Sequence, residues 1–400
     1  MGRAVSQAST RRLWRITNEP RPYAWGIPGG IGAVFGATST SGDPEAELWL
    51  GSHPGSPARF DDLDAPWPDL AGWESLQPNP LPFLVKVLAV GGSLSIQSHP
   101  SRAQAEVGFA RETASGIPID APNRSYRDPN AKPELLVAVE DGFEALCGFR
   151  EPATVLADLD RLLGHHPDPG LEPLRHRVSE SGLAATTRWL LGGGSEVGAV
   201  VATLSRRARG RTAPAVVDRV AREYPADPGV AVALLLNHVV LPRGGALFLD
   251  AGTVHAYLGG VGVEVMGPSD NVVRGGLTPK YVDVDELLAI STFEPTRPVL
   301  LAPDTLGPHL RSYRPRCASG SVGFELLEAT GPGLVRLGSA SVMVVLEGDF
   351  AVADANQRMR LTRGESALYA EPGQLRIDGS GRMFVATAEL DATWGEQPRL

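Results

Sequence analysis

The sequence predicts a mainly β protein that carries an inserted block of short helices. Two observations lead to this fold class. Apolar runs of strand length separated by turn residues occupy both ends of the chain, and helical spacing of apolar residues interrupts them in the middle. The 400-residue chain contains 46 glycines and 34 prolines, as expected when many short strands are joined by turns. This length allows two or three domains.

Short strands and turns make up the region from Leu13 to about Arg150. Residues 84–90 predict a strand that ends at Gly91, residues 94–98 predict a second strand, and residues 134–139 predict a third. Turn-rich loops interrupt these strands. We therefore expect a β domain to begin here.

Helical spacing dominates residues 151–237. Apolar residues recur three and four positions apart over residues 155–163, 197–204 and 216–221. Glycine- and proline-rich breaks separate these stretches. The sequence therefore predicts several short helices, inserted between two parts of a β domain.

Strand patterns return after the helical block. Residues 246–250 predict a strand that leads into a turn ending at His255, and residues 262–266 predict the next strand. A Thr- and Pro-rich join at residues 291–298 precedes a final region of glycine-spaced strands. The expected strands of this region are residues 324–329, 342–346, 350–352 and 383–388.

The chain thus divides into three expected domains. One β domain comprises residues 1–150 and 238–295, a helical domain comprises residues 151–237, and a second β domain comprises residues 296–400. The last domain has no cluster of metal-ligating residues, so we expect it to be structural and non-catalytic.

Charge and composition exclude several classes of function. The net charge is −9 and no long basic run occurs, which argues against nucleic-acid binding. The apolar runs are too short for a membrane span, and residues 1–20 lack the apolar core of a signal peptide. Cys147 and Cys317 form no C-x-x-C pattern and fit reduced residues. We therefore expect a cytoplasmic protein, acting as a monomer.

Only three of the 37 basic residues are lysines, namely Lys86, Lys132 and Lys280. Lysine is a compact ammonium whose pKa shifts on burial, whereas arginine is a broad and permanently charged fork. We interpret the three lysines as positions where arginine cannot substitute. Chance survival in an arginine-rich composition is the alternative. All three fall near the best candidates for metal ligands.

A mixed set of nitrogen and oxygen ligands indicates a metal site. Gln97 and His99 are two apart on a strand pattern and face the same side, Glu134 opens another strand, and His255 ends a turn. Such a set without thiolates suits zinc or another first-row divalent ion in an open catalytic site. Each residue is a weak signal alone, since a lone histidine more often serves the core or the surface. We interpret the other histidines as core or surface residues, and His53 is the one whose loop should be checked for proximity to the site.

Five segments together resemble the type I mannose-6-phosphate isomerase family. They are Tyr-Ala-Trp-Gly at 23–26, Glu-Leu-Trp-Leu-Gly at 47–51, Ser-Ile-Gln-Ser-His-Pro at 95–100, and residues 126–134 and 248–280. The resemblance implies a cupin-type β-barrel or jelly roll with a helical insertion and a second cupin-like domain. It implies one zinc ion per chain.

In the matching motifs, the zinc ligands are Gln97, His99, Glu134 and His255, and Arg274 is an active-site arginine. One departure is that the family reads Asn-His-Lys-Pro-Glu, whereas this chain has Ala131 in place of the histidine. The departure places in doubt any step that needs an imidazole beside Glu134.

The resemblance implies that the chain interconverts mannose 6-phosphate and fructose 6-phosphate, a small-molecule sugar phosphate pair. Moving a proton between C1 and C2 needs a base, a cation for the developing oxyanion and an anchor for the phosphate. The candidate catalytic residues are Arg274, Lys132 and Asp270, and the candidate substrate-binding residues are Ser95, Lys86, Lys280 and Glu264.

The base remains open between Asp270 and Glu264. Glu264 could instead orient His255, and Asp270 could instead cap a turn. Two other functions also remain open. A metal-dependent cupin oxygenase would use similar ligands, and a non-catalytic sugar-binding protein would bind its sugar on stacked aromatic side chains.

Overall fold

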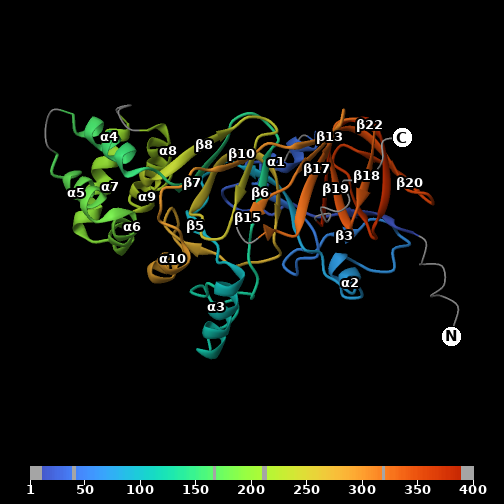
Figure 1. Cartoon of the computed structure of the whole chain (residues 1–400), viewed down its shortest axis with the longest axis horizontal. Helices are drawn as coiled ribbons and strands as arrows, with labels where there is room; N and C mark the ends of the chain where they lie inside the picture. Colours follow the sequence, from blue (N-terminus) through green and yellow to red (C-terminus); the bar gives the residue numbers. More distant parts are fainter. Residues whose placement is uncertain (1–10, 38–41, 165–167, 210–213, 318–319, 389–400) are drawn as a thin grey trace.

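The structure is a computed structural model that describes residues 11–37, 42–164, 168–209, 214–317 and 320–388. Figure 1 shows a group of helices at one end of the long axis, a sheet in the centre, and a second sheet at the other end. The expected class, mainly β with a cupin-type β region, a helical insertion and a second β region, is confirmed. Across these ranges, no helix is both long and apolar enough to cross a membrane.

The central sheet contains ten strands and carries the expected metal ligands. Its strands are β2 (Glu47–Leu50), β4 (Leu84–Val90), β5 (Gln97–Ser98), β6 (Glu134–Ala138), β7 (Phe143–Phe149), β8 (Leu236–Leu241), β9 (Ala246–Leu249), β10 (His255–Met266), β11 (Val273–Arg274) and β12 (Val299–Leu301).

Strand β10 joins the two halves of this sheet. Its first half pairs with β5 and β7, and its second half pairs with β4 and β6. The register shifts between Tyr257 and Gly259, and Gly260 has φ of +114°, a conformation that favours glycine. A Cβ at Gly260 would also lie 2.8 Å from Cα of Phe143. His255 begins this bent strand, directly after the turn that the sequence predicted to end at this residue.

Side chains of β4 alternate between the two faces of the central sheet, and this alternation places Lys86 on the face toward the site. Val85 and Val87 pack into the core that the central sheet shares with the second sheet, whereas Leu88 and Val90 pack into a separate core inside the central region. Because strand side chains alternate, Lys86 lies on the same face as Leu88. A charged residue is thus buried on the inner face of a wholly buried strand.

The second sheet also has ten strands. They are β1 (Leu13–Thr17), β3 (Arg59–Phe60), β13 (Asp304–Gly307), β14 (Leu310–Tyr313), β17 (Phe324–Ala329), β18 (Gly333–Leu337), β19 (Ser341–Ala353), β20 (Arg358–Thr362), β21 (Ser366–Tyr369) and β22 (Gly373–Ala388). A separate hairpin pairs β15 (Arg316–Cys317) with β16 (Gly320–Ser321). Strand β1 pairs with β21, so a strand from the start of the chain completes this C-terminal sheet.

Buried side chains hold the two sheets together. Val87 of the central sheet shares one apolar core with Val344 and Phe384 of the second sheet. Arg382, which is 2% exposed, donates to the carbonyl oxygen of Val139 and forms a buried ion pair with Glu328. A buried charge is tolerated there because its hydrogen bonds are satisfied.

The helical insertion lies between β7 and β8. It consists of α4 (Pro152–Leu163), α5 (Glu172–Glu180), α6 (Gly182–Gly192), α7 (Ser195–Ala208), α8 (Ala215–Glu223) and α9 (Gly229–Leu235). The three predicted helical stretches correspond to α4, α7 and α8. Four helices outside the insertion, which the sequence had not predicted, are α1 (Gly30–Val34), α2 (Leu70–Glu74), α3 (Arg102–Ala114) and α10 (Val284–Ile290).

Candidate metal centre

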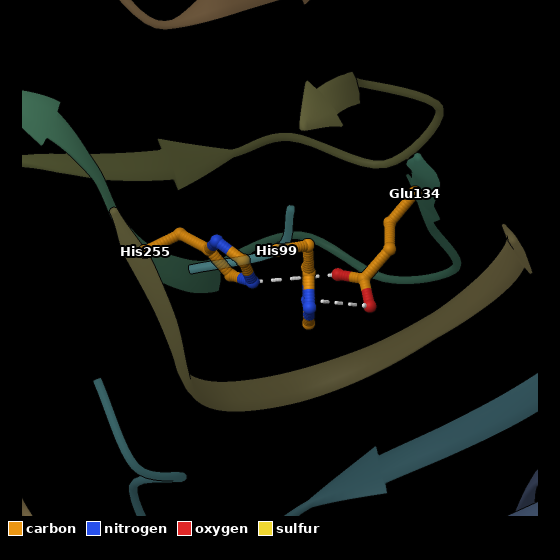
Figure 2. Close-up of side chains that lie close together, drawn as sticks. All are labelled: His99, Glu134 and His255. Carbon is orange, nitrogen blue, oxygen red and sulfur yellow. Dashed lines mark ion pairs between the residues drawn. The ribbon is translucent and has the colours of Figure 1, made fainter. Parts of the chain in front are cut away.

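Three buried side chains converge at the centre of the first sheet. Nε2 of His99 lies 3.2 Å from Oε1 of Glu134, and Nε2 of His255 lies 3.4 Å from Oε2 of the same carboxylate. The ligand atoms all lie within 4.8 Å of one another. Figure 2 shows that the two imidazoles and the carboxylate point toward one another, although they come from different segments.

Backbone carbonyls orient both imidazoles. Nδ1 of His99 lies 2.7 Å from the carbonyl oxygen of Asn271, and Nδ1 of His255 lies 2.8 Å from that of Thr253. A carbonyl oxygen only accepts, so each Nδ1 carries the proton and each Nε2 keeps a free lone pair. Both Nε2 atoms and Oε2 of Glu134 are buried without a hydrogen-bond partner in the described structure. A shared cation would satisfy all three atoms.

The charge states also suit a metal. Burial alone would raise the pKa of Glu134, but the ammonium of Lys132 holds it well below its ordinary value. Nζ of Lys132 lies 3.0 Å from Oε1 of Glu134. Burial, together with the positive charge of Lys132, lowers the pKa of His99 to about 4. The carboxylate is therefore ionised and this imidazole neutral at neutral pH, which are the forms that bind metals.

Gln97 is close in the strand ladder to these ligands. It pairs with His255 on one side and with Arg274 on the other. Its side chain is partly buried. The register is compatible with an amide oxygen as the fourth ligand, and this assignment remains a prediction.

A group of buried charged residues, Lys86, Glu47 and Glu264, lies beside the metal ligand Glu134. Lys86 pairs across the strands with Glu264 of β10, and its Nζ lies 3.5 Å from Oε2 of Glu264 and 3.6 Å from Oε2 of Glu47. Burial opposes the charge on Lys86, but the two carboxylates outweigh it and raise its pKa. The hydroxyl of Tyr257 donates to Glu264 at 3.0 Å. Burial and the nearby Glu134 raise the pKa of Glu264 to about 7.

A cavity of about 700 Å³ brings together three of the candidate substrate-binding and catalytic residues, Ser95, Arg274 and Lys280. Its wall also includes Tyr23 and Trp25, whose rings stack 5.8 Å apart, and Glu223 and Tyr224 from the end of the α8 segment.

Arg274 is a half-buried cation in this cavity. It forms no ion pair within the part of the chain that the structure describes, and burial together with the nearby Arg127 lowers its pKa. Lys280 is exposed, and burial of its stem together with Arg274 lowers its pKa. Cations without carboxylate partners in an otherwise acidic protein are suited to bind an anion.

Asp270 lies in a different setting. Its Oδ2 lies 3.1 Å from Nε2 of His53, so the loop that carries this histidine contacts one of the candidate residues. The hydrogen bond to His53, which outweighs burial, lowers the pKa of Asp270. Asp270 is exposed, and its backbone N–H donates to Asp128. These contacts fit a turn residue better than a base poised near neutral pH.

Ala131, which replaces the histidine of the family pattern, faces a second cavity of about 500 Å³ with Pro133 and Asn130. This cavity does not include Arg274 or Lys280. Position 131, where the family has an imidazole, therefore lies outside the wall that carries the candidate substrate-binding cations.

Sequence reasoning missed several residues that shape the site. Tyr257 is two residues after His255 on a strand, and this spacing is a signal that could have revealed it. Asn271 accepts from the backbone of Arg127 and Asp128 through Oδ1, while its carbonyl orients His99. Glu223 and Tyr224 belong to the helical insertion, and no local pattern marks them as cavity residues.

Comparisons with known proteins agree with this arrangement. A model of the phosphomannose isomerase type I catalytic domain matches residues 13–152. Mannose-6-phosphate isomerase of Shigella flexneri is 35% identical over 393 residues, and that of Escherichia coli strain K12 is 36% identical over 393 residues. Each alignment covers 93% of this chain and 98% of the relative. A solved structure of zinc-bound mannose 6-phosphate isomerase has a TM-score of 0.84 and 32% identity, covering 95% of this chain and 100% of that one.

Proposed function

The chain belongs to the type I phosphomannose isomerase family, and from this premise we propose that it interconverts mannose 6-phosphate and fructose 6-phosphate. The proposal rests above all on one observation. Three buried ligand atoms, on His99, Glu134 and His255, converge and have no hydrogen-bond partner among the described residues, and Arg274, whose backbone pairs with that of Gln97, lines a cavity together with Lys280.

We propose that His99, Glu134 and His255 hold one zinc ion and that Gln97 completes the protein's ligand set. The geometry fits the ion, because nitrogen and oxygen donors without thiolate are typical of catalytic zinc sites. When bound, zinc would polarise the oxygens of the substrate at C1 and C2. Lys132 would keep Glu134 ionised and would offer its ammonium to an anionic substrate oxygen.

Of the two candidate bases, the surroundings favour Glu264 over Asp270. A base that works near neutral pH needs a pKa near 7, and burial with Glu134 nearby raises that of Glu264 to about 7. Asp270 is held as a carboxylate by His53, so it is a weak proton acceptor. Glu264 is also 3% exposed and lies on the same sheet face as Lys86.

Replacing Glu264 by glutamine should lower kcat at least about a hundredfold, because general-base catalysis is typically worth that factor or more. Asp270→Asn should cost much less. Activity of the wild type should rise with pH toward about 7, since only the ionised Glu264 accepts a proton. Steady-state kinetics over pH 5.5 to 8.5 tests this, with the window set at roughly 1.5 units on either side of neutrality. A larger loss in Asp270→Asn than in Glu264→Gln would assign the base to Asp270.

The buried lysines should not tolerate arginine. Lys132 and Lys86 are each 8% exposed, whereas Lys280 is exposed. A guanidinium at position 132 would crowd the site or engage Glu134 in a bidentate pair that competes with the metal. We expect Lys132→Arg to lose at least about tenfold in kcat/KM, which is about 1.4 kcal/mol. Lys86→Arg should also suffer, and Lys280→Arg, the matched control, should suffer least.

Near-normal kinetics for all three lysine-to-arginine variants would mean that the lysines survive by chance. The metal centre would be unaffected by that result, because its ligands are other residues.

A coupled assay tests the isomerase function. It starts from mannose 6-phosphate and records the rate at which a second enzyme consumes the fructose 6-phosphate that forms. Mannose 6-phosphate should be consumed, and chelation of the metal should stop the reaction. A cupin oxygenase would consume dioxygen instead, and a binding protein would hold the sugar without turnover. Either of those results would replace the proposed function.

We propose that residues 1–150 and 238–295 form the catalytic cupin-type domain, 151–237 the helical domain and 296–400 the second cupin-like domain. Strand β1 qualifies this division, because it hydrogen-bonds to β21 of the last part. All the proposed site residues come from one chain, so we propose an active monomer. A cytoplasmic location also remains a proposal, and sedimentation and cell fractionation test these two points.

A further inference from the structure

We propose that the corner between α8 and α9 of the helical insertion, residues 223–229, positions the substrate-binding loop, residues 274–280. Asp227 is the positioning residue. This inference rests on the proposed function and extends it to a part of the fold distant from the metal ligands in sequence. In Figure 1, α8 and α9 are the helices of the insertion that lie next to the strands of the central sheet.

Asp227 binds the loop that joins the two cavity cations. Its Oδ1 accepts from the backbone N–H of Leu277 at 2.8 Å, and its Oδ2 accepts from that of Thr278 at 3.1 Å. Oδ1 also accepts from the N–H of Gly229 at 2.7 Å, which fixes the carboxylate on its own corner. Two donors separated from Asp227 by about fifty residues are thus satisfied by one side chain, and charge-assisted bonds of this kind are the stronger ones.

The loop needs such support because its backbone is strained. Leu277 has φ of +52°, and within the described ranges it is the residue other than glycine with a positive φ. This conformation is unfavourable for a residue with a Cβ, so it persists only where the surrounding structure holds it. The side chain of Leu277, which is 1% exposed, packs into the core formed by the insertion helices. Backbone and side chain of this residue are therefore both held by the insertion.

Close packing of two glycines fixes the distance between corner and loop. A Cβ at Gly276, whose φ is +113°, would lie 2.6 Å from Cα of Gly229. A Cβ at Gly229 would in turn overlap the backbone of Gly276 and Leu277. The two backbones thus approach more closely than side chains permit, so the loop has little freedom relative to the corner.

The same loop continues to the metal-ligand strand. Gly275 N–H donates to the carbonyl oxygen of Ile96 at 2.7 Å, and Ile96 N–H donates to that of Gly276 at 3.0 Å. Ile96 directly precedes Gln97 and shares the insertion core with Leu277. A displacement of the loop would therefore also displace the backbone next to Gln97.

The corner supports the opposite side of the cavity as well. Glu223 accepts from the N–H of Ser93 at 2.7 Å, and the hydroxyl of Tyr224 donates to the carbonyl oxygen of Ser93 at 2.9 Å. Ser93 precedes Ser95 in the cavity wall. The corner thus bridges the two segments that carry Ser95 on one side and Arg274 and Lys280 on the other.

The affinity for glucitol 6-phosphate, measured by calorimetry, tests this role. This probe is a sugar-alcohol phosphate without a carbonyl group to isomerise. Asp227→Ala should raise the Kd of this probe, and the KM for mannose 6-phosphate, at least about tenfold, because small misplacements of binding groups are costly. The zinc content should stay that of the wild type. Asp227→Asn keeps one acceptor oxygen and should restore part of the affinity.

Two controls separate positioning from loss of stability. Asp218→Ala removes a carboxylate of α8 that, among the described residues, pairs with Arg222 on the same helix, and its Kd should equal that of the wild type. Leu361→Ala removes a side chain of β20 that is 0% exposed and lies in the core of the second sheet, so it should lower Tm. A merely destabilised enzyme contains less folded protein, but each folded molecule keeps its Kd.

A wild-type Kd in Asp227→Ala, or an equal rise in Kd in Leu361→Ala, would overturn the inference. Failure of the proposed function is a separate result, since wild-type protein would then bind the probe without isomerising mannose 6-phosphate. Wild-type protein that binds no sugar phosphate would overturn both.

Discussion

The His255→Ala protein should contain no stoichiometric zinc and should turn over mannose 6-phosphate at least about a thousandfold more slowly than the wild type, which is about 4 kcal/mol. His255 contributes one of three buried atoms that have no hydrogen-bond partner among the described residues, so its loss opens the ligand set. His99 and Glu134 would remain, and these two ligands are fewer than the three that catalytic zinc sites use.

Elemental analysis of purified His255→Ala tests the first half of this prediction, and the coupled assay tests the second. The variant should remain folded, because the apolar cores of both sheets contain no metal ligand. His238→Ala is the matched control. His238 also pairs with a carboxylate, Glu144 at 3.0 Å, but it lies at the surface away from the centre. Full metal occupancy in His255→Ala would refute the ligand set.

The Arg274→Ala enzyme should lose roughly two to three orders of magnitude in kcat, or about 2.7 to 4 kcal/mol, with a smaller change in KM. Arg274 is half-buried, faces the cavity and forms no ion pair in the described part of the chain, so its charge is available to the substrate. A cation that meets charge mainly in the enediolate lowers the barrier without tightening the ground state.

Arg360→Ala, which removes an exposed guanidinium paired with Asp349, should leave both constants unchanged. If Arg274→Ala altered only KM, the residue would be a phosphate anchor, and the stabilisation of the enediolate would have to come from Lys132 or the metal. Saturation kinetics with mannose 6-phosphate distinguishes these outcomes.

The features that local sequence patterns specify were predicted well. The run Leu84–Val90 is a buried strand as expected, and the apolar spacing at residues 216–221 corresponds to α8, whose apolar residues are buried. Strand alternation and residue type nominated His99, Glu134 and His255, which the structure brings together. Gln97, nominated with them, stays a prediction. The family resemblance was confirmed, and it named the substrate class that composition alone leaves open.

Features that depend on contacts distant in sequence could not be predicted. Nothing in Leu13–Thr17 reveals that β21 is its partner, because pairing of strands is decided by tertiary packing. The bend of β10, which brings Tyr257 to Glu264, depends on glycines that also occur in ordinary turns. Asp227 acts across about fifty residues of sequence, and an aspartate beside a proline reads locally as a turn residue.

The central claim is tested most directly by measuring zinc content and turnover of mannose 6-phosphate on one sample. The two quantities are measured before chelation, after chelation and after zinc is restored. We expect about one zinc per chain at the start, loss of turnover in proportion to loss of zinc, and recovery when zinc returns. The fold should persist throughout, which circular dichroism would record. Undiminished turnover by metal-free protein would contradict the claim that His99, Glu134 and His255 form a catalytic metal centre.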